Sequence, residues 1–198
     1  MKATKVLLLI TVWALALQLH YAEAQTLSVK TYKLTVAGTS SLHEWESNVE
    51  RLEAQGSFVL TNSKLTDIKD VAVKIPVTAI KSTKGKMMDN KTYEAFKHEK
   101  NPHIVFKMTG RTINAASQSL DVTGNLTMAG VTKAIDLNLT YKVLTGGEIQ
   151  VSGSKKLVMS QFKMDPPTAM MGTIKVGDEV TVTFDLVLTQ SAFVKTKN

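Results

Sequence analysis

The chain has 198 residues, 43% of them hydrophobic, and no cysteine, which excludes disulfide cross-links and thiol chemistry. Its 24 lysines and arginines exceed its 17 aspartates and glutamates, and the net charge of +7 favours acidic partners while also being compatible with simple solubility. The basic residues are not interleaved with aromatic ones as in strands that bind RNA, so we expect no nucleic-acid partner.

The first residues have the pattern of a secretory signal peptide. Lys2 and Lys5 form a short basic region, residues 6–19 are apolar, and residues 22–24 read Ala-Glu-Ala, the small residues of a cleavage site. We expect residues 1–24 to be removed, which leaves a mature chain that starts at Gln25 in the periplasm or outside the cell. An uncleaved anchor is the alternative. The rest, residues 25–198, has the size of a single domain.

Apolar and polar residues alternate through most of the mature chain, which is typical of strands buried on one face. Eight or nine such segments joined by tight turns predict an all-β antiparallel sheet that covers itself as a barrel or a sandwich, and their length favours a barrel. Around eight strands leave an interior that is filled by side chains or holds one small ligand. Gly56, Gly124 and Gly153 share the inward parity and favour a cavity.

One long stretch, residues 81–107, interrupts the strands and predicts a lid. Its centre, residues 89–97, has the pattern of a short helix, with Asp89 as the N-cap and Tyr93 and Phe96 on one apolar face. We expect this face to cover one end of the barrel. The alternative is a helix that only plugs a filled barrel.

The candidate ligand-binding residues come from the inward strand positions, the lid and the Met-rich connection at residues 161–172. Lys81, Lys84 and Lys86 precede the helix and predict a basic rim, which suits an amphiphile with an anionic end, phosphate or pyrophosphate ahead of carboxylate. The apolar candidates are Phe58, Met87, Met88, Tyr93, Phe96, Phe106, Phe162 and Met164.

The sequence offers no catalytic or metal-binding motif. HExxH is absent, His98 and His103 lack the spacing of a metal clamp, and there is neither a G-x-S-x-G elbow nor a phosphate-binding glycine loop. His43 followed by Glu44 is the one pair with the composition of an acid–base site. We therefore expect no metal, no cofactor and no enzymatic activity, with a hydrolase of small amphiphiles as the minor alternative.

Four short segments carry a family resemblance. Residues 126–133 read LTMAGVTK, residues 38–45 read GTSSLHEW, residues 101–106 read NPHIVF, and residues 174–180 read IKVGDEV. Together, in their order along the chain, they resemble the YceI-like family of exported bacterial polyisoprenoid-binding proteins, and the resemblance covers residues 32–188.

The resemblance implies an extended eight-stranded antiparallel, lipocalin-like barrel that holds an isoprenoid or another long-chain lipid, without catalysis. GTSSLHEW departs from the histidine-serine start of many members, so no head-group contact is transferred. The expected function is a binding protein that carries or sequesters such a lipid, with transient contact to a membrane surface. A stress-related structural barrel without ligand is the alternative, and the oligomeric state, including a homodimer, is left open.

Overall fold

The computed structural model describes residues 26–191, which form one compact unit. The predicted signal peptide, residues 1–24, lies outside the described residues. Within residues 26–191, none of the helices has the length and apolar character needed to cross a membrane.

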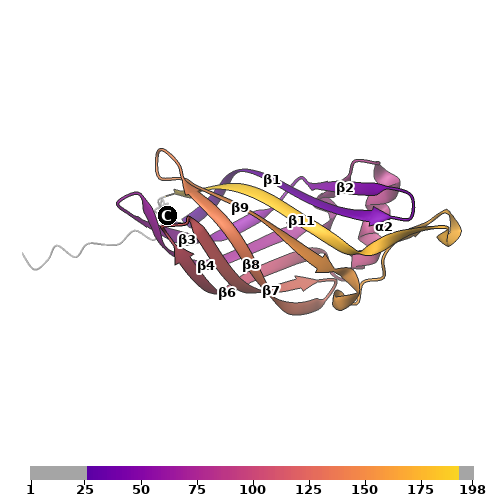
Figure 1. The fold of residues 1–198 in the computed structure, drawn as a ribbon. Coiled ribbons are helices and arrows are strands. Elements are labelled where there is room, and N and C mark those ends of the chain that lie inside the picture. The colour runs from indigo at the N-terminus through magenta and orange to yellow at the C-terminus, as the bar shows by residue number, and fades with distance from the viewer. Residues whose placement is uncertain (1–25, 192–198) are drawn as a thin grey trace, which may run out of the picture. The chain divides into compact units, whose positions relative to one another are not determined.

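The unit consists of strands, three short 3-10 turns and the helix α2 (Figure 1). All pairings between neighbouring strands are antiparallel. The strand order is β3-β4-β6-β7-β8-β9-β11-β1-β2-β5, with β10 paired to β11 beside this path. The bounds are β1 Thr26–Ser40, β2 Glu44–Val49, β3 Glu53–Thr61, β4 Lys64–Pro76, η1 Val77–Ala79, β5 Ile80–Ser82, α2 Lys86–Phe96, β6 His103–Asn114, β7 Ser119–Met128, β8 Val131–Val143, β9 Ile149–Val158, η2 Met159–Phe162, β10 Thr168–Ala169, η3 Met170–Gly172 and β11 Ile174–Ser191.

The sheet curls round until its end strand β3 reaches β1 and β11. β3 contacts β1, and the side-chain amide of Gln190 on β11 donates a hydrogen bond to the carbonyl of Phe58 on β3. The predicted all-β antiparallel barrel with one helix is confirmed. The predicted count of eight or nine strands is too low, because β5 and β10, with three and two residues, add to it. Strands of two or three residues are too short to show alternation.

Side chains inside the sheet form two apolar clusters. One lies at the helix end and includes Phe96, Phe162 and Met164, and the other contains Phe58 and residues of β7, β8 and β9. Phe106 and Phe184 pack against both clusters. The two aromatic rings therefore connect the ends of a continuous apolar interior.

Two inward-facing glycines make room for these rings. A Cβ at Gly124 would overlap the ring of Phe106, and a Cβ at Gly153 would overlap Leu139 and crowd the ring of Phe184. The sequence predicted that such glycines leave open space or permit a bend. In the structure, neighbouring side chains occupy the space at both positions.

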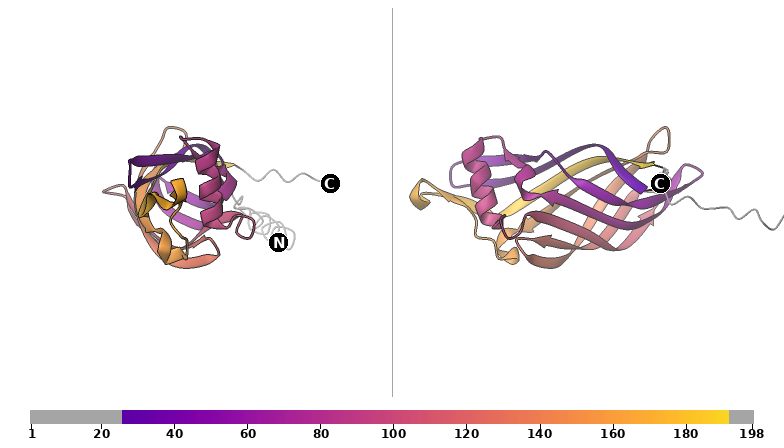
Figure 2. Two further views of the ribbon diagram at one scale, coloured as in Figure 1. Left: turned by 90° about the vertical axis from the view of Figure 1, so that its right-hand side faces the viewer. Right: turned by 180° about the vertical axis from the view of Figure 1, so that it is seen from behind.

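The helix α2 lies across one end of the sheet (Figure 2). It begins three residues before the predicted start, with Gly85 at the N-cap in a conformation of positive φ (89°), and ends at Lys97 in the left-handed region. Asp89 is therefore not the N-cap. It lies in the first turn of the helix, where its carboxylate binds a neighbouring strand instead.

Candidate ligand-binding cavity

A cavity of about 520 Å³ occupies the interior of the barrel. This volume lies in the range of about 300–1,000 Å³ that is common for small-molecule sites. Among the described residues, no aspartate or glutamate lines it. Aliphatic side chains from the inward face of the sheet form most of the wall, together with these aromatic residues and methionines: Trp45, Met87, Met88, Phe96, Met108, Phe106, Met128, Met159, Met164 and Phe184.

The cavity opens at the helix end. Four of its lining residues are exposed: His43 on the β1–β2 turn, Lys84 before α2, Met87 on α2, and Thr168 on β10. The other lining residues are buried or half-buried. The mouth is therefore framed by the β1–β2 turn, the start of α2 and the arm formed by β10 and β11.

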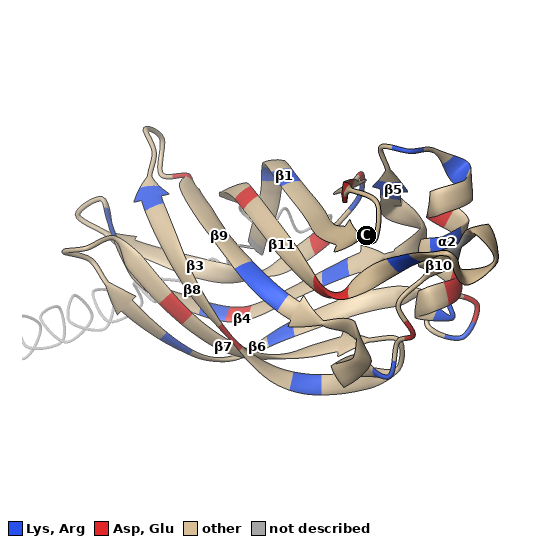
Figure 3. Cartoon of the chain, turned by 45° about the vertical axis from the view of Figure 1, so that its right-hand side comes forward, with Lys and Arg blue, Asp and Glu red and all other residues tan. Residues whose placement is uncertain are grey.

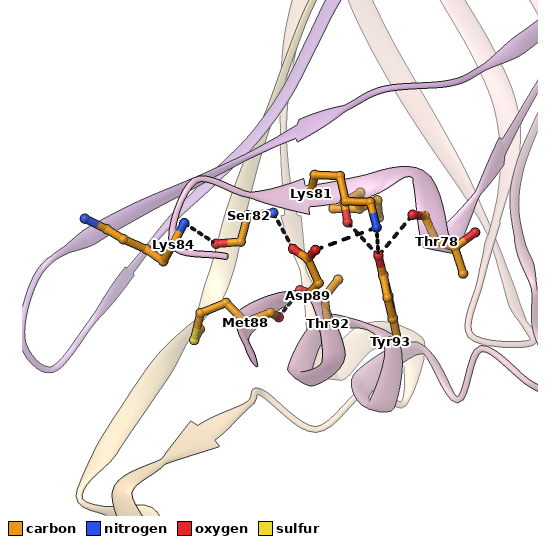
Figure 4. A network of polar contacts seen from close by, with 9 residues as sticks. Thr78, Lys81, Ser82, Lys84, Met88, Asp89, Thr92 and Tyr93 are labelled. Atoms are coloured by element: carbon orange, nitrogen blue, oxygen red, sulfur yellow. Dashed lines mark hydrogen bonds and ion pairs between the residues drawn. The ribbon is translucent and has the colours of Figure 1, made fainter. Parts of the chain in front are cut away.

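Asp89 and Tyr93 fasten α2 to the neighbouring chain (Figure 4). The Oδ1 atom of Asp89 accepts a hydrogen bond of 2.7 Å from the backbone N–H of Ser82, and its Oδ2 atom lies 3.6 Å from Nζ of Lys81. The hydroxyl of Tyr93 accepts a 2.6 Å hydrogen bond from Lys81 and lies 3.0 Å from the carbonyl oxygen of Thr78. These contacts hold the lid in place through its polar side.

The ammonium group of Lys81 is bound within this network. Its hydrogen bond to Tyr93 is the main cause that raises the pKa of its ammonium group above 10.5, and the carboxylates of Asp89 and Glu50 act in the same direction. The charge of Lys81 therefore stabilises the attachment of the lid and is not directed to the cavity mouth.

The helix face that lines the cavity includes the predicted Met87, Met88 and Phe96 but not Tyr93. Met88, Thr92, Ala95 and Phe96, three and four residues apart, line the cavity. Tyr93 turns toward η1 and β5, because its hydroxyl finds carbonyl oxygens there. Its ring still packs against the apolar cluster at the helix end.

The structure brings together six of the predicted site residues and separates five. Met87, Met88, Phe96, Phe106, Met164 and Lys84 line the cavity. The others do not: Phe58 and Phe162 are buried in the two clusters, Tyr93 and Lys81 bind each other, and Lys86 is exposed at the start of α2. Phe58 and Phe162 are buried in the clusters without lining the cavity. Alternation predicts that a side chain faces inward, but it does not tell whether that side chain lines the cavity or is buried beside it.

The lining residues that the prediction did not name include Trp45 on β2, Lys91 on α2 and Lys155 on β9. Lys155 had a usable signal, because Ile149, Val151, Lys155 and Leu157 have the same parity and all line the cavity. Lys91 pairs with Glu94 at 2.9 Å.

The histidine at the mouth, His43, forms a hydrogen bond with the backbone. The Nδ1 atom of His43 lies 2.9 Å from the backbone carbonyl oxygen of Glu44, so the ring interacts with the backbone of its neighbour. Within residues 26–191, no group of three His, Asp or Glu side chains is arranged to hold a metal ion.

Solved structures of low sequence identity share the fold. BcnA from Burkholderia cenocepacia is 21% identical, with a TM-score of 0.66 over 80% of this chain and 96% of that one. A polyisoprenoid-binding domain from Saccharophagus degradans, described as implicated in plant cell wall breakdown, is 13% identical, with a TM-score of 0.63 over 85% and 99% of the two chains. The YCEI protein of Campylobacter jejuni is 22% identical, with a TM-score of 0.57 over 73% and 84%.

Comparison with curated proteins gave no significant match. The family model of the YceI-like domain matches residues 22–188, which is most of the sequence and spans every strand that lines the cavity. The chain therefore belongs to the YceI-like family.

Proposed function

We propose that this protein binds a long-chain amphiphile, an isoprenoid or a similar lipid, inside the barrel, and that it carries or sequesters this ligand without catalysis. The observation that carries the proposal is the apolar cavity of about 520 Å³ that opens beside α2. A filled structural barrel would offer no such space. Membership of the YceI-like family and the fold shared with a polyisoprenoid-binding domain also support a lipid ligand.

Burial of a hydrocarbon chain supplies enough free energy for this function. Each methylene group removed from water contributes about 0.8 kcal/mol, so roughly ten buried groups contribute about 8 kcal/mol. This is comparable with the cost of association, estimated at about 4–15 kcal/mol, and a longer buried chain exceeds it. The affinity therefore depends mainly on how much of the chain enters the cavity.

We propose export of the protein to the periplasm or the exterior, with a mature start at Gln25. The sequence pattern of residues 1–24 supports this location. N-terminal sequencing of protein from the exported fraction tests it. Intact Met1 on protein in a membrane fraction would overturn both the cleavage and the location.

We also propose that ligand exchange takes place at a membrane surface, and the residues around the mouth support this. Leu42, Met87, Met170 and Met171 are exposed apolar side chains on the segments that frame it. Met170 and Met171 also have positive φ, 51° and 52°, which is an unfavourable backbone conformation for methionine. Lysines lie on α2 and on the loop before it (Figure 3), and they suit an anionic lipid surface.

Vesicle co-sedimentation tests this contact. The protein should bind phosphatidylglycerol vesicles better than phosphatidylcholine vesicles, and replacing both methionines by asparagine, which tolerates positive φ, should weaken binding. Val59→Asn provides the control, because Val59 is also exposed but lies on β3. Equal binding by the parent protein and the Met170→Asn/Met171→Asn variant would reject the arm as a membrane contact.

Fluorescence of Trp45 tests the binding function itself. Trp45 lines the cavity, and its Nε1–H donates a 3.0 Å hydrogen bond to the carbonyl of Thr39. Titration with farnesol should give a saturable change in emission that Trp45→Phe abolishes, which assigns the change to Trp45 and not to Trp13. Absence of a saturable change, together with absence of bound farnesol by mass spectrometry, would reject the proposal.

A further inference from the structure

Lys155 is a positively charged residue on the inward face of the barrel. On β9, Val151, Lys155 and Leu157 line the cavity, whereas Lys156 points outward and pairs with Glu179 at 2.8 Å. The partner of Lys155 in the sheet is Val182 on β11, which also lines the cavity. Both the alternation along β9 and the register with β11 therefore direct Lys155 inward.

Lys155 precedes Met159 and lies on β9, the strand that leads to the apolar cluster at the helix end. Met159, two inward positions further along the chain, is buried in the cluster that contains Phe96. Four residues of extended chain separate Lys155 from Met159, which is about 13 Å at about 3.3 Å per residue. Lys155 is thus placed inside the barrel, whereas Lys84 is exposed at its mouth.

The surroundings of Lys155 provide no counter-charge. Among residues 26–191, no carboxylate lines the cavity, and Lys155 forms no ion pair within 4.0 Å. Lys91, the other half-buried lysine of the lining, has Glu94 as its partner. Among the described residues, Lys155 is therefore the half-buried lysine of the lining that has no acidic partner.

We propose that Lys155 binds an anionic group of the ligand inside the barrel. This inference rests on the proposed function and specifies its ligand as an amphiphile that carries a phosphate or carboxylate. An apolar ligand that fills the cavity displaces water from the ammonium group and leaves a buried charge without a partner, which is unfavourable. A ligand with an anionic group supplies that partner through a charge-assisted hydrogen bond, which is strengthened by the low dielectric of the apolar wall.

The proposal predicts the orientation of the ligand. The anionic group enters the barrel and reaches Lys155, so the selectivity does not depend on the lysines of the rim. Since an enclosed ion pair is screened less than an exposed one, the preference for the anion should persist at high salt. A head group held by rim lysines would lose its preference as the salt concentration rises.

Calorimetric titration of the full chain with farnesyl phosphate and with farnesol tests the inference. Lys155→Met should weaken binding of farnesyl phosphate by about tenfold or more and leave farnesol unchanged or tighter, because the charge is lost while the side-chain volume is kept. Lys155→Arg should retain the preference for the phosphate. Lys156→Met, the outward neighbour, is the matched control and should change neither affinity. Palmitate and hexadecanol form a second pair, which distinguishes a carboxylate from a phosphate.

The outcomes separate this inference from the function on which it rests. Binding of farnesol without binding of any anionic ligand, or equal anion binding by the parent and Lys155→Met, overturns the inference and leaves the lipid-binding function intact. If the combined Lys84→Gln and Lys86→Gln variant loses the preference while Lys155→Met keeps it, the anion lies at the rim and the inference fails. No binding of any of the four ligands to the parent overturns the proposed function as well.

Discussion

The buried carboxylate of Asp89 on α2 accepts a hydrogen bond of 2.7 Å from the backbone N–H of Ser82 on β5. The same carboxylate lies 3.6 Å from the ammonium group of Lys81. A single side chain thus satisfies a strand amide and a lysine, and it joins the lid to the sheet.

Replacing Asp89 by alanine should loosen the lid. The amide of Ser82 and the charge of Lys81 lose their partner, and we expect a loss of about 1–3 kcal/mol in the free energy of unfolding. Urea denaturation measures the loss, and hydrogen exchange at the Ser82 amide locates it. Glu94→Gln is the control: its pair with Lys91 is on the surface, so a change below about 0.5 kcal/mol is expected. Equal losses in the two variants would contradict the role of Asp89.

Substitutions of Tyr93 and Phe96, three residues apart on α2, should have different effects: the first should lower mainly the stability and the second mainly the affinity for the ligand. Tyr93→Phe removes the hydroxyl that binds Lys81 and should lower stability by about 1 kcal/mol, with little change in the affinity for farnesol, because Tyr93 does not line the cavity. Phe96→Asp places an unpaired charge against the cavity and should lower the affinity by about tenfold or more. Denaturation and Trp45 fluorescence provide the two readouts. A normally folded Phe96→Asp variant that binds as much lipid as the parent would refute the lid assignment.

Gly124 should tolerate no side chain while Phe106 keeps its position. The Cβ of alanine at position 124 overlaps the ring of Phe106, so Gly124→Ala should cost about 1–3 kcal/mol through overpacking. Adding Phe106→Leu should recover part of this loss, because the smaller side chain vacates the space. Thermal and urea unfolding of the single and double variants measure the coupling. Strictly additive losses would mean that the two residues do not compete for space.

Asp67 should contribute an acid-sensitive part of the stability. The Nε–H of Arg111 donates a 2.6 Å hydrogen bond to its carboxylate, and this contact is the main cause that lowers the pKa of Asp67 below 3.8. Since the pKa is lower in the folded state, the stabilisation is present above about pH 3.8 and is lost as the pH falls through the folded value. The difference in Tm between the parent and Asp67→Asn should be constant above about pH 5 and should shrink below about pH 3.8. A difference that is independent of pH would exclude the ion pair as its source.

The strands were predictable because alternation reports directly which side chains face the interior. It located the inward positions of β3, β6, β7, β8 and β9, and it located Phe106 in the cavity wall. The same rule places Lys155 inside, but the prediction followed only apolar residues along β9 and passed over a charged one. Lys155 therefore occupies an inward position of the alternation, and it was missed because it is charged whereas its inward-facing neighbours are apolar.

The exclusion of Tyr93 from the cavity lining could not be predicted from the sequence. The face that α2 turns to the cavity depends on where Tyr93 finds hydrogen-bond partners, and these are the backbone carbonyls of Thr78 and Ile80 in a segment that pairs with β2. The start of the helix depends on Gly85 rather than on a side-chain cap. Both features arise from tertiary contacts that local periodicity does not contain.

Native mass spectrometry of the protein, purified without detergent from the exported fraction of its own host, tests the central claim most directly. We expect a population heavier than the mass of the polypeptide by that of one long-chain amphiphile, and this excess mass should disappear after organic extraction and be reduced in Phe96→Asp. Only the mass of the polypeptide, for protein that also fails to take up added farnesol or farnesyl phosphate, would contradict a lipid-binding cavity.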